Sequence, residues 1–232
     1  MIKDSKWNWP LGWINRVLEL GNLSVPVLHN DVADKVIWKN NNGNEVDFSV
    51  GRVWKDTREC GSKVRWSKVV WFSQCVPSHA FILWLAMRDR MQTQDRMAKW
   101  CPATDFSCMS CDKQSDSMDH LFFRCEYSNY IWEEMKEYIE DKTIPNSWKD
   151  VKDWIIRKKS NNSAASVIQR LIVAACVYMI WKERNTRLFS KTQMPKEKVR
   201  DKIIEVVKIR FIRLRFKDGD EYNKVKKKWN IV

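Results

Sequence analysis

The sequence predicts a mainly α-helical protein with a small N-terminal β-hairpin and a compact knuckle of Cys and His residues. Apolar residues recur three and four positions apart along most of the chain, which is the spacing of one helix face. Two short strand-like runs flank an Asn-rich turn near residue 40, and this arrangement predicts a hairpin. Three Cys and one His lie within the 18 residues from Cys108 to Cys125, where we expect the knuckle.

The composition excludes several classes of protein. Apolar residues make up 44% of the chain and aromatic residues 12%, which is too much for a disordered protein. With only 6 Gly in 232 residues, the chain lacks the glycine-rich loops that hold phosphates in nucleotide-binding proteins. The longest apolar run, Leu171–Trp181, is 11 residues long, whereas a membrane span needs about 20.

The start of the chain and its Cys content predict an intracellular protein that is not secreted. No apolar stretch follows the first basic residues, so the start does not resemble a secretory signal. The 7 Cys are an odd number and a small share of the chain, which argues against a disulfide scaffold. In a reducing compartment, a cluster of Cys is therefore expected to bind a metal.

We predict four segments along the chain. An N-terminal extension covers residues 1–34, and the Cys-containing domain covers 35–140. A helix with a linker covers 141–160, and a basic helical region covers 161–232. The polar stretch Ser160–Ser163 is the strongest boundary signal, because Ser and Asn favour loops.

The first 60 residues are predicted to hold a short helix, a hairpin and a second helix. The short helix lies near Ile14–Leu20. The hairpin pairs Lys35–Trp38 with Val46–Val50 across a turn over Asn40–Asn44, because the second run alternates apolar and polar residues. Ser49 then has the side chain and the position of a helix N-cap.

The middle of the chain contains the segment that we expect at the centre of the core. Apolar residues within Trp66–Trp71 recur at helical spacing. Pro77 starts a helix over Ser78–Met87 with almost no polar face, which predicts burial. Thr93 is expected to cap a short basic helix over Gln94–Trp100. Four Trp are expected on apolar helix faces and therefore in the core: Trp54, Trp71, Trp84 and Trp132.

The second half of the chain is predicted to be helical. Ser128 is expected to cap a helix over Asn129–Glu140, and Ser147 to begin another helix. A long helix over Ala164–Phe189 is apolar nearly all round in its first half, so we expect that half to be buried. A last helix over Lys196–Lys217 precedes a polar tail.

The strongest chemical signal is the spacing Cys108-x2-Cys111-x8-His120-x4-Cys125. A Cys-x2-Cys pair can direct two thiolates at one ion across a tight turn, and a His with a third Cys completes the four ligands of a structural zinc site. Since four protein ligands leave no position for water, the pattern predicts a structural rather than a catalytic Zn²⁺. Thiolate ligands also exclude Mg²⁺ and Ca²⁺. The predicted knuckle is therefore stabilised by zinc.

Other interpretations of these residues stay open. The three Cys could be buried thiols beside an unrelated His. Cys101 could compete as a ligand, but it lies outside the Cys-x2-Cys pair, so we interpret it as a packing thiol. Asp119 could orient the imidazole of His120, although a solvated carboxylate is the more common role of such a residue.

Several motifs around these ligands resemble the reverse transcriptase zinc-binding domain of plant non-LTR (LINE-type) retroelement polyproteins. The resemblance covers Lys35–Glu140 and depends most on the run Asp119–Cys125, whose sequence is DHLFFRC. A weaker likeness continues through Ile180–Asn185, a segment that often follows this domain. The family usually has Pro after its first and last zinc-binding Cys, where this chain has Met109 and Glu126. The other matching residues are Phe48–Val50, Trp54, Val70–Phe72, Val76–Leu85, Thr93–Arg96 and Trp132.

The resemblance implies a zinc-binding module that is associated with reverse transcriptase and handles RNA or DNA. It does not imply polymerase activity, which needs a carboxylate cluster for two metal ions, and no two adjacent Asp occur in this chain. A His-Glu-x-x-His motif is also absent, and His29 is isolated. Cys75 and His79 have the spacing of a Cys–His pair, but Pro77 between them argues against a shared helix face. We therefore predict no enzymatic activity.

Positive charge is concentrated towards the C-terminus. Residues 182–232 hold 17 Lys and Arg against 7 Asp and Glu, which accounts for 10 of the chain's 13 net positive charges. Lys and Arg neutralise phosphates, and exposed aromatic rings can stack on unpaired bases. The candidate nucleic-acid contacts are Lys208, Arg210, Arg213, Arg215 and Lys217 in the last helix, and Arg88, Arg90, Arg96, Lys99 and Arg124 near the metal ligands in sequence.

Together these observations predict a non-catalytic zinc-binding module derived from a retroelement reverse transcriptase polyprotein, with RNA or DNA as its partner. Association with a reverse transcriptase is expected from the resemblance, and residence in the nucleus from the resemblance and the basic tail. The alternative is a zinc-stabilised structural or protein-interaction remnant without nucleic-acid binding, whose basic residues only form solvated faces. A membrane-surface role ranks lower, because the basic residues do not share one helix face, and we expect no membrane partner.

Overall fold

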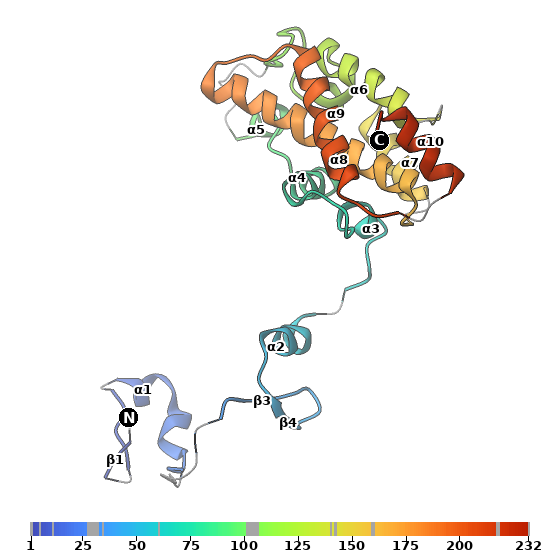
Figure 1. The fold of residues 1–232 in the computed structure, drawn as a ribbon. Helices are drawn as coiled ribbons and strands as arrows, with labels where there is room; N and C mark the ends of the chain where they lie inside the picture. Colours follow the sequence, from blue (N-terminus) through green and yellow to red (C-terminus); the bar gives the residue numbers. More distant parts are fainter. Residues whose placement is uncertain are drawn as a thin grey trace. The chain divides into compact units, whose positions relative to one another are not determined.

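The computed structural model describes residues 2–4, 6–10, 12–26, 33, 35–59, 61–100, 107–139, 141, 143–158, 161–216 and 219–231. These residues are mostly helical, with short hairpins in the N-terminal part, so the predicted fold class is confirmed (Figure 1). The chain divides into two compact units, residues 1–61 and residues 62–232. The four segments predicted from composition stay a prediction, because this division reflects contacts alone. Ser163, in the predicted linker, is the N-cap of the helix that follows and accepts a hydrogen bond from the Ser166 amide at 3.3 Å.

The beginning of the N-terminal unit differs from the prediction. Its elements are β1 (Ile2–Lys3), β2 (Lys6–Trp7), α1 (Trp13–Arg16) and a 3₁₀-helix η1 (Leu18–Asn22). The two strands pair antiparallel, which the sequence did not predict. The prediction of a single helix near Ile14–Leu20 is wrong. Two short helices form there instead, separated at Val17, which has an extended φ of −135°. The indole N–H groups of Trp7 and Trp9 donate to the carbonyls of Ser24 and Leu20.

The rest of the N-terminal unit follows the prediction closely. Strands β3 (Ile37–Lys39) and β4 (Glu45–Asp47) form an antiparallel hairpin in which Trp38 faces Val46. Gly43 has a φ of +81° in the turn, a conformation that Gly adopts without strain. Helix α2 (Val50–Thr57) begins where predicted, and the Ser49 hydroxyl accepts a hydrogen bond from the Arg52 amide at 3.3 Å. The hairpin and the cap are confirmed.

The second unit is a bundle of helices around one long central helix. The elements are α3 (Ser67–Val70), α4 (Pro77–Met87), α5 (Gln94–Met97), a π-helical turn η2 (His120–Arg124), α6 (Glu126–Ile139), α7 (Trp148–Arg157), α8 (Ala164–Asn185), a second π-helical turn η3 (Thr186–Ser190), α9 (Lys196–Ile212) and α10 (Asp220–Lys228). Helix α8 packs against α4, α6, α9 and α10, so its apolar surface is covered on several sides (Figure 1).

The central helix has the burial that its composition predicts. From Val167 to Val177 nearly every residue of α8 is buried, including positions all round the helix. The α-helix ends at Asn185, four residues before the predicted end, and η3 continues it to Ser190. Together they make a helix long and apolar enough to cross a bilayer, and 67% of its most apolar part is buried inside the unit. A helix in the core of a globular protein has the same length and apolar composition, so these two features alone are weak evidence for a membrane span.

Several predictions about helix boundaries and faces were wrong. Phe81 on α4 is 50% exposed, so the predicted all-round burial of that helix fails on one face. Thr93 occupies the predicted N-cap position of α5, but its hydroxyl donates to the Asp95 carboxylate and makes no capping hydrogen bond, and α5 ends at Met97 instead of Trp100. Helix α6 begins at Glu126, and Ser128 is therefore inside its first turn rather than an N-cap. The Ser128 hydroxyl donates to the Cys125 carbonyl instead.

The Trp residues divide between core and surface. Trp132 is buried as predicted, and Trp84 is half-buried against the core. Trp54 and Trp71 are exposed, which contradicts their predicted core positions. Because α2 lies in the small N-terminal unit, where no described helix residue is buried, the apolar face that carries Trp54 has no core to cover it within that unit.

The C-terminus is more ordered than predicted. Helix α9 ends at Ile212, five residues before the predicted end at Lys217, which lies outside the described residues. The predicted polar tail is wrong, because residues 220–228 form α10. Val225 and Trp229 are four positions apart, both are buried, and the Trp229 ring lies 5.0 Å from that of Tyr138. Val225 and Trp229, together with Tyr222, whose ring lies 6.0 Å from that of Phe211, dock a helix whose other residues are mostly charged.

Candidate metal centre

The loop that carries the Cys-x2-Cys pair is a tight, hydrogen-bonded turn. The Cys108 carbonyl accepts from the amides of Cys111 at 3.2 Å and Asp112 at 2.8 Å, and the Cys108 amide donates to the Gln114 carbonyl at 2.7 Å. Asp112 has a φ of +51°, which reverses the chain direction after Cys111. A single antiparallel bridge between Ser107 and Ser115 closes the base of the loop. This turn directs both thiols to the same side.

A π-helical turn positions the other two candidate ligands. The Cys125 amide donates to the His120 carbonyl five residues earlier, at 2.9 Å. In an α-helix, residues five apart lie about 140° apart around the axis, so their side chains diverge. The wider π-turn brings positions five apart towards the same side, as the His-x4-Cys spacing requires. The three residues before Arg124 are apolar and buried, which anchors this turn in the core.

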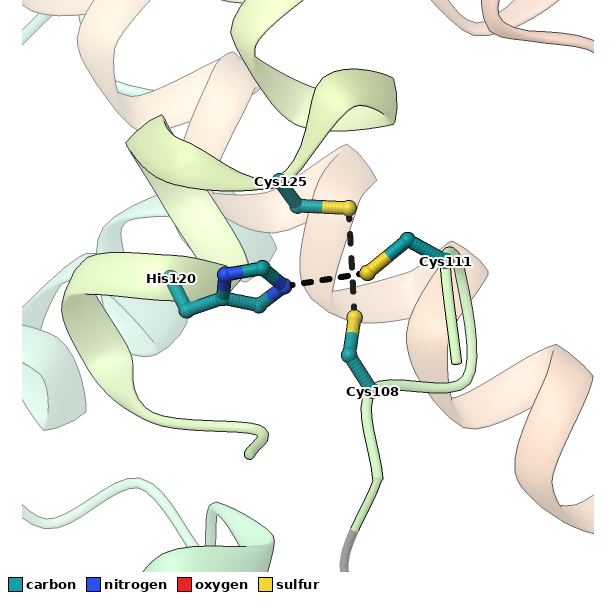
Figure 2. A group of neighbouring side chains, drawn as sticks. All are labelled: Cys108, Cys111, His120 and Cys125. Atoms are coloured by element: carbon teal, nitrogen blue, oxygen red, sulfur yellow. Dashed lines mark hydrogen bonds between the residues drawn. The ribbon is translucent and has the colours of Figure 1, made fainter. Parts of the chain in front are cut away.

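The four candidate ligands converge on one point. Their ligand atoms, three Sγ and one imidazole nitrogen, all lie within 4.8 Å of one another. Figure 2 shows the side chains pointing towards each other, with the Sγ atoms of Cys108 and Cys125 at 3.9 Å and the Cys111 Sγ at 3.2 Å from the His120 Nε2. Tetrahedral zinc with Zn–S bonds of about 2.3 Å would separate its sulfur ligands by about 3.8 Å. The cluster therefore has the dimensions and donor atoms of a zinc site.

Burial and mutual contact shift the pKa values of the cluster. The Cys108 thiol donates to the Cys125 sulfur, and this bond together with burial raises the pKa of Cys108. The same hydrogen bond lowers the pKa of Cys125. Burial lowers the pKa of His120, so its imidazole is neutral and can offer the Nε2 lone pair to an ion. Because crowded thiolates repel one another, a divalent cation is the partner that would allow all three to ionise.

The neighbours of the cluster do not all have the predicted roles. Asp119 does not orient His120: its carboxylate accepts from the Trp148 amide at 2.7 Å, at the start of α7, and pairs with Arg124 at 3.0 Å. The alternative of a freely solvated carboxylate is also wrong for this residue. Cys101, predicted to be a packing thiol, lies outside the described residues.

Cys75 and His79 do not form the Cys–His pair that their spacing allows, as the Pro between them led us to expect. His79 is buried in the core and its ring stacks on Tyr178 with centroids 4.4 Å apart. Burial lowers the pKa of His79 to about 4, so the imidazole stays neutral near neutral pH. No hydrogen bond joins Cys75 and His79 among the residues that the structure describes, and His29 lies outside them.

The candidate nucleic-acid contacts fall into two groups. Five have exposed side chains that make no hydrogen bond or ion pair with a described residue: Arg88, Arg90, Lys99, Arg213 and Arg215. The others are wholly or partly engaged in the protein, although Arg124 is also exposed. Arg210 donates to the carbonyls of Gln74 and Cys75, Lys208 to the carbonyl of Asn230, and Arg124 pairs with Asp119. Arg96 is half-buried, and Lys217 lies outside the described residues.

The comparison with protein families agrees with this geometry. Residues 48–132 match the family described as zinc-binding in reverse transcriptase. The matched region contains all four residues of the cluster and lies within the predicted domain, 35–140. Neither the curated proteins nor the solved structures contain a match to this chain. That family is a zinc-binding accessory region of reverse transcriptases, distinct from the catalytic polymerase domain, and residues 48–132 are similar to it.

Sequence reasoning missed the residues that surround the cluster. Four buried residues connect the candidate metal-binding loop, residues 107–119, to the end of α8 and to η3: Asp116, Glu183, Arg184 and Arg187. Three of them lie in or just after the segment Ile180–Asn185, whose likeness to sequences that follow the zinc-binding domain was the one available signal. Asp116 lies in the eight-residue spacer between two ligands, and nothing in the sequence distinguishes it there.

Proposed function

We propose that this chain is a non-catalytic module that binds one Zn²⁺ through Cys108, Cys111, His120 and Cys125. The observation that supports this most strongly is the convergence of three sulfur atoms and one imidazole nitrogen in a largely buried site. Such a donor set suits Zn²⁺ and is unsuited to Mg²⁺ or Ca²⁺, which prefer oxygen. Four protein ligands leave no coordination position for water or substrate, so the ion would stabilise the fold and perform no reaction.

Zinc analysis of the purified chain tests this proposal. The unaltered protein is expected to contain about one Zn²⁺ per chain. Replacement of one ligand, Cys111→Ser, is expected to abolish stoichiometric zinc binding at micromolar concentration. Cys75→Ser is the matched control, because Cys75 is also half-buried and lies outside the cluster. Zinc content unchanged by Cys111→Ser, or lost equally with Cys75→Ser, would rule out the assigned ligands.

We further propose that the module binds single-stranded RNA or DNA. The support is electrostatic and steric. The net charge is +13, and three exposed cations follow α4 and precede the candidate metal ligands in the sequence: Arg88, Arg90 and Lys99. Trp100, next to Lys99, is 86% exposed. Cations that neutralise phosphates beside a ring that stacks on bases are what unpaired nucleic acid requires.

Fluorescence anisotropy with single-stranded RNA and DNA over a salt series distinguishes this proposal from the alternative, a zinc-stabilised remnant that binds no nucleic acid. Binding is expected to weaken as salt rises, and removal of each phosphate-binding cation should reduce the slope of log K against log salt by about 0.7 to 1. The test variant is Arg88→Gln/Arg90→Gln/Lys99→Gln. The control, Lys149→Gln/Lys198→Gln/Lys202→Gln, removes the same charge from exposed sites on α7 and α9.

Two results would decide against nucleic-acid binding at this surface. No binding at about 150 mM salt would favour the structural or protein-interaction remnant. Equal weakening by the test and control variants would mean that net charge alone causes the binding. Origin in a plant LINE-type element, association with a reverse transcriptase and residence in the nucleus are further parts of this proposal, and they rest on the family resemblance.

A further inference from the structure

A buried ion pair joins the metal-binding loop to the central helix. Asp116 lies in the spacer between Cys111 and His120 and is fully buried. Its Oδ2 accepts from the Arg184 Nε at 3.0 Å and Nη2 at 2.8 Å, and Arg184, near the end of α8, is buried as well. The two residues are 68 positions apart in the sequence. Each charge is costly to bury alone, so the pair is maintained only while the loop stays docked on α8.

A second contact with the same loop comes from Arg187, which lies in η3, about one helical turn after Arg184. The Arg187 Nη1 lies 3.5 Å from the carbonyl oxygen of Met109, inside the Cys-x2-Cys turn. The Arg187 Nε donates to the Glu183 carboxylate at 2.8 Å, which fixes the guanidinium on α8. Glu183 also accepts from the Met194 amide at 2.8 Å. The turn that carries two candidate ligands is thus supported from outside by the end of α8.

Two buried polar atoms near the cluster have no hydrogen-bond partner among the described residues. One is the Nδ1 of His120, and the other is the Oδ1 of Asp116. When Nε2 faces an ion, Nδ1 carries the proton and is a donor, whereas the carboxylate oxygen is an acceptor. A buried donor and a buried acceptor therefore remain, on two residues that are four positions apart in the chain.

We propose that Asp116 and Arg184 are positioning residues of the metal centre. Asp116 accepts the Nδ1 proton of His120 when Nε2 binds the ion, and Arg184 holds Asp116 in place from α8. The metal centre then includes a helix that lies well beyond the last ligand in sequence, outside the region that matches the family. This inference rests on the proposed zinc binding. A carboxylate that orients a metal-bound His typically contributes about 10- to 100-fold to metal affinity.

The test measures Zn²⁺ affinity of the full chain by competition with a chromophoric chelator. Asp116→Asn keeps the shape of the side chain and removes its charge, and Arg184→Gln removes the partner. Both are expected to weaken zinc binding about 10- to 100-fold. Arg184→Lys keeps one charged donor and should lose less than Arg184→Gln. Substitution of Co²⁺ adds a spectroscopic readout, because a change in the His ligand alters the visible absorption of the tetrahedral site.

Arg170→Gln is the matched control. Arg170 is also a buried Arg of α8, but its guanidinium donates to the carbonyls of Ser166, Lys68 and Asn161, away from the cluster. It should lower the stability of the fold and leave zinc affinity and the Co²⁺ spectrum unchanged. If Asp116→Asn and Arg184→Gln bind zinc within about twofold of the unaltered chain, this inference is overturned and the proposed function is not. The same holds if Arg170→Gln loses as much zinc affinity as these two variants. Absence of zinc binding by the unaltered chain would instead overturn the proposed function.

Discussion

Removal of zinc with a strong chelator is expected to unfold the segment from Cys108 to Ile139. The ligands come from a loop and a π-turn that pack together only when the segment is folded, so metal binding and folding are one process. Apparent zinc-binding free energies of about 10–16 kcal/mol in small zinc domains exceed or equal the net stability of a typical domain, about 5–15 kcal/mol. Without the ion, three buried polar side chains lose the partner that compensates for their removal from water, and the folded state is destabilised: Cys108, Cys125 and His120.

Far-UV circular dichroism and hydrogen exchange would measure this effect. Chelation is expected to reduce the helical signal and to remove exchange protection first from η2 and α6, and re-addition of Zn²⁺ should restore both. Addition of Mg²⁺ and Ca²⁺ in place of zinc is the control, and it should restore neither. Unchanged circular dichroism after complete removal of zinc would show that the helical unit is stable without a metal.

Truncation of the Trp132 side chain, Trp132→Ala, is expected to cost about 3–5 kcal/mol of unfolding free energy. Trp132 is 2% exposed and packs edge-on against Phe123, with ring centroids 5.2 Å apart. Its indole N–H donates to the Pro145 carbonyl at 3.1 Å, so the substitution also removes a partly buried hydrogen bond. Since Phe123 lies in the π-turn between His120 and Cys125, the cavity would also loosen the support of two candidate ligands.

Urea denaturation of the zinc-saturated protein would measure this loss. Trp100→Ala is the matched control, because the same side chain is removed from a position that is 86% exposed, and it should change stability by no more than about 0.5 kcal/mol. A Trp132→Ala variant that loses less than about 1 kcal/mol, or no more than Trp100→Ala, would contradict the packing described for α6.

Local sequence information predicted the parts of the structure that depend on neighbours in the chain. The caps at Ser49 and Ser147 accept hydrogen bonds from amides three residues later, so short-range chemistry decides them. The starts of α2 and α7 were predicted for this reason, and the four candidate metal ligands were selected from their spacing alone. A Cys-x2-Cys pair needs only a tight turn to bring its thiols together.

Other local features were mispredicted because a less common conformation competes with the expected one. Ser128 has the composition of an N-cap, yet the π-turn at His120–Arg124 allows α6 to begin at Glu126. The apolar residues of α4 indicated burial all round, but burial requires a covering element on every face. The face that carries Phe81 has no such cover within the described unit.

The sequence by itself determined which four residues form the Cys and His cluster, the helical character and the order of the main helices, because these depend on spacing and on residue type. Only the tertiary structure decided which charges are free and which are buried. Arg210 and Arg184 are both basic residues in helices, but one donates to the loop before α4 and the other pairs with Asp116 beside the metal-binding loop. Such partners lie 68 or more positions apart, and they meet only through the tertiary packing of the second unit, which no local pattern records.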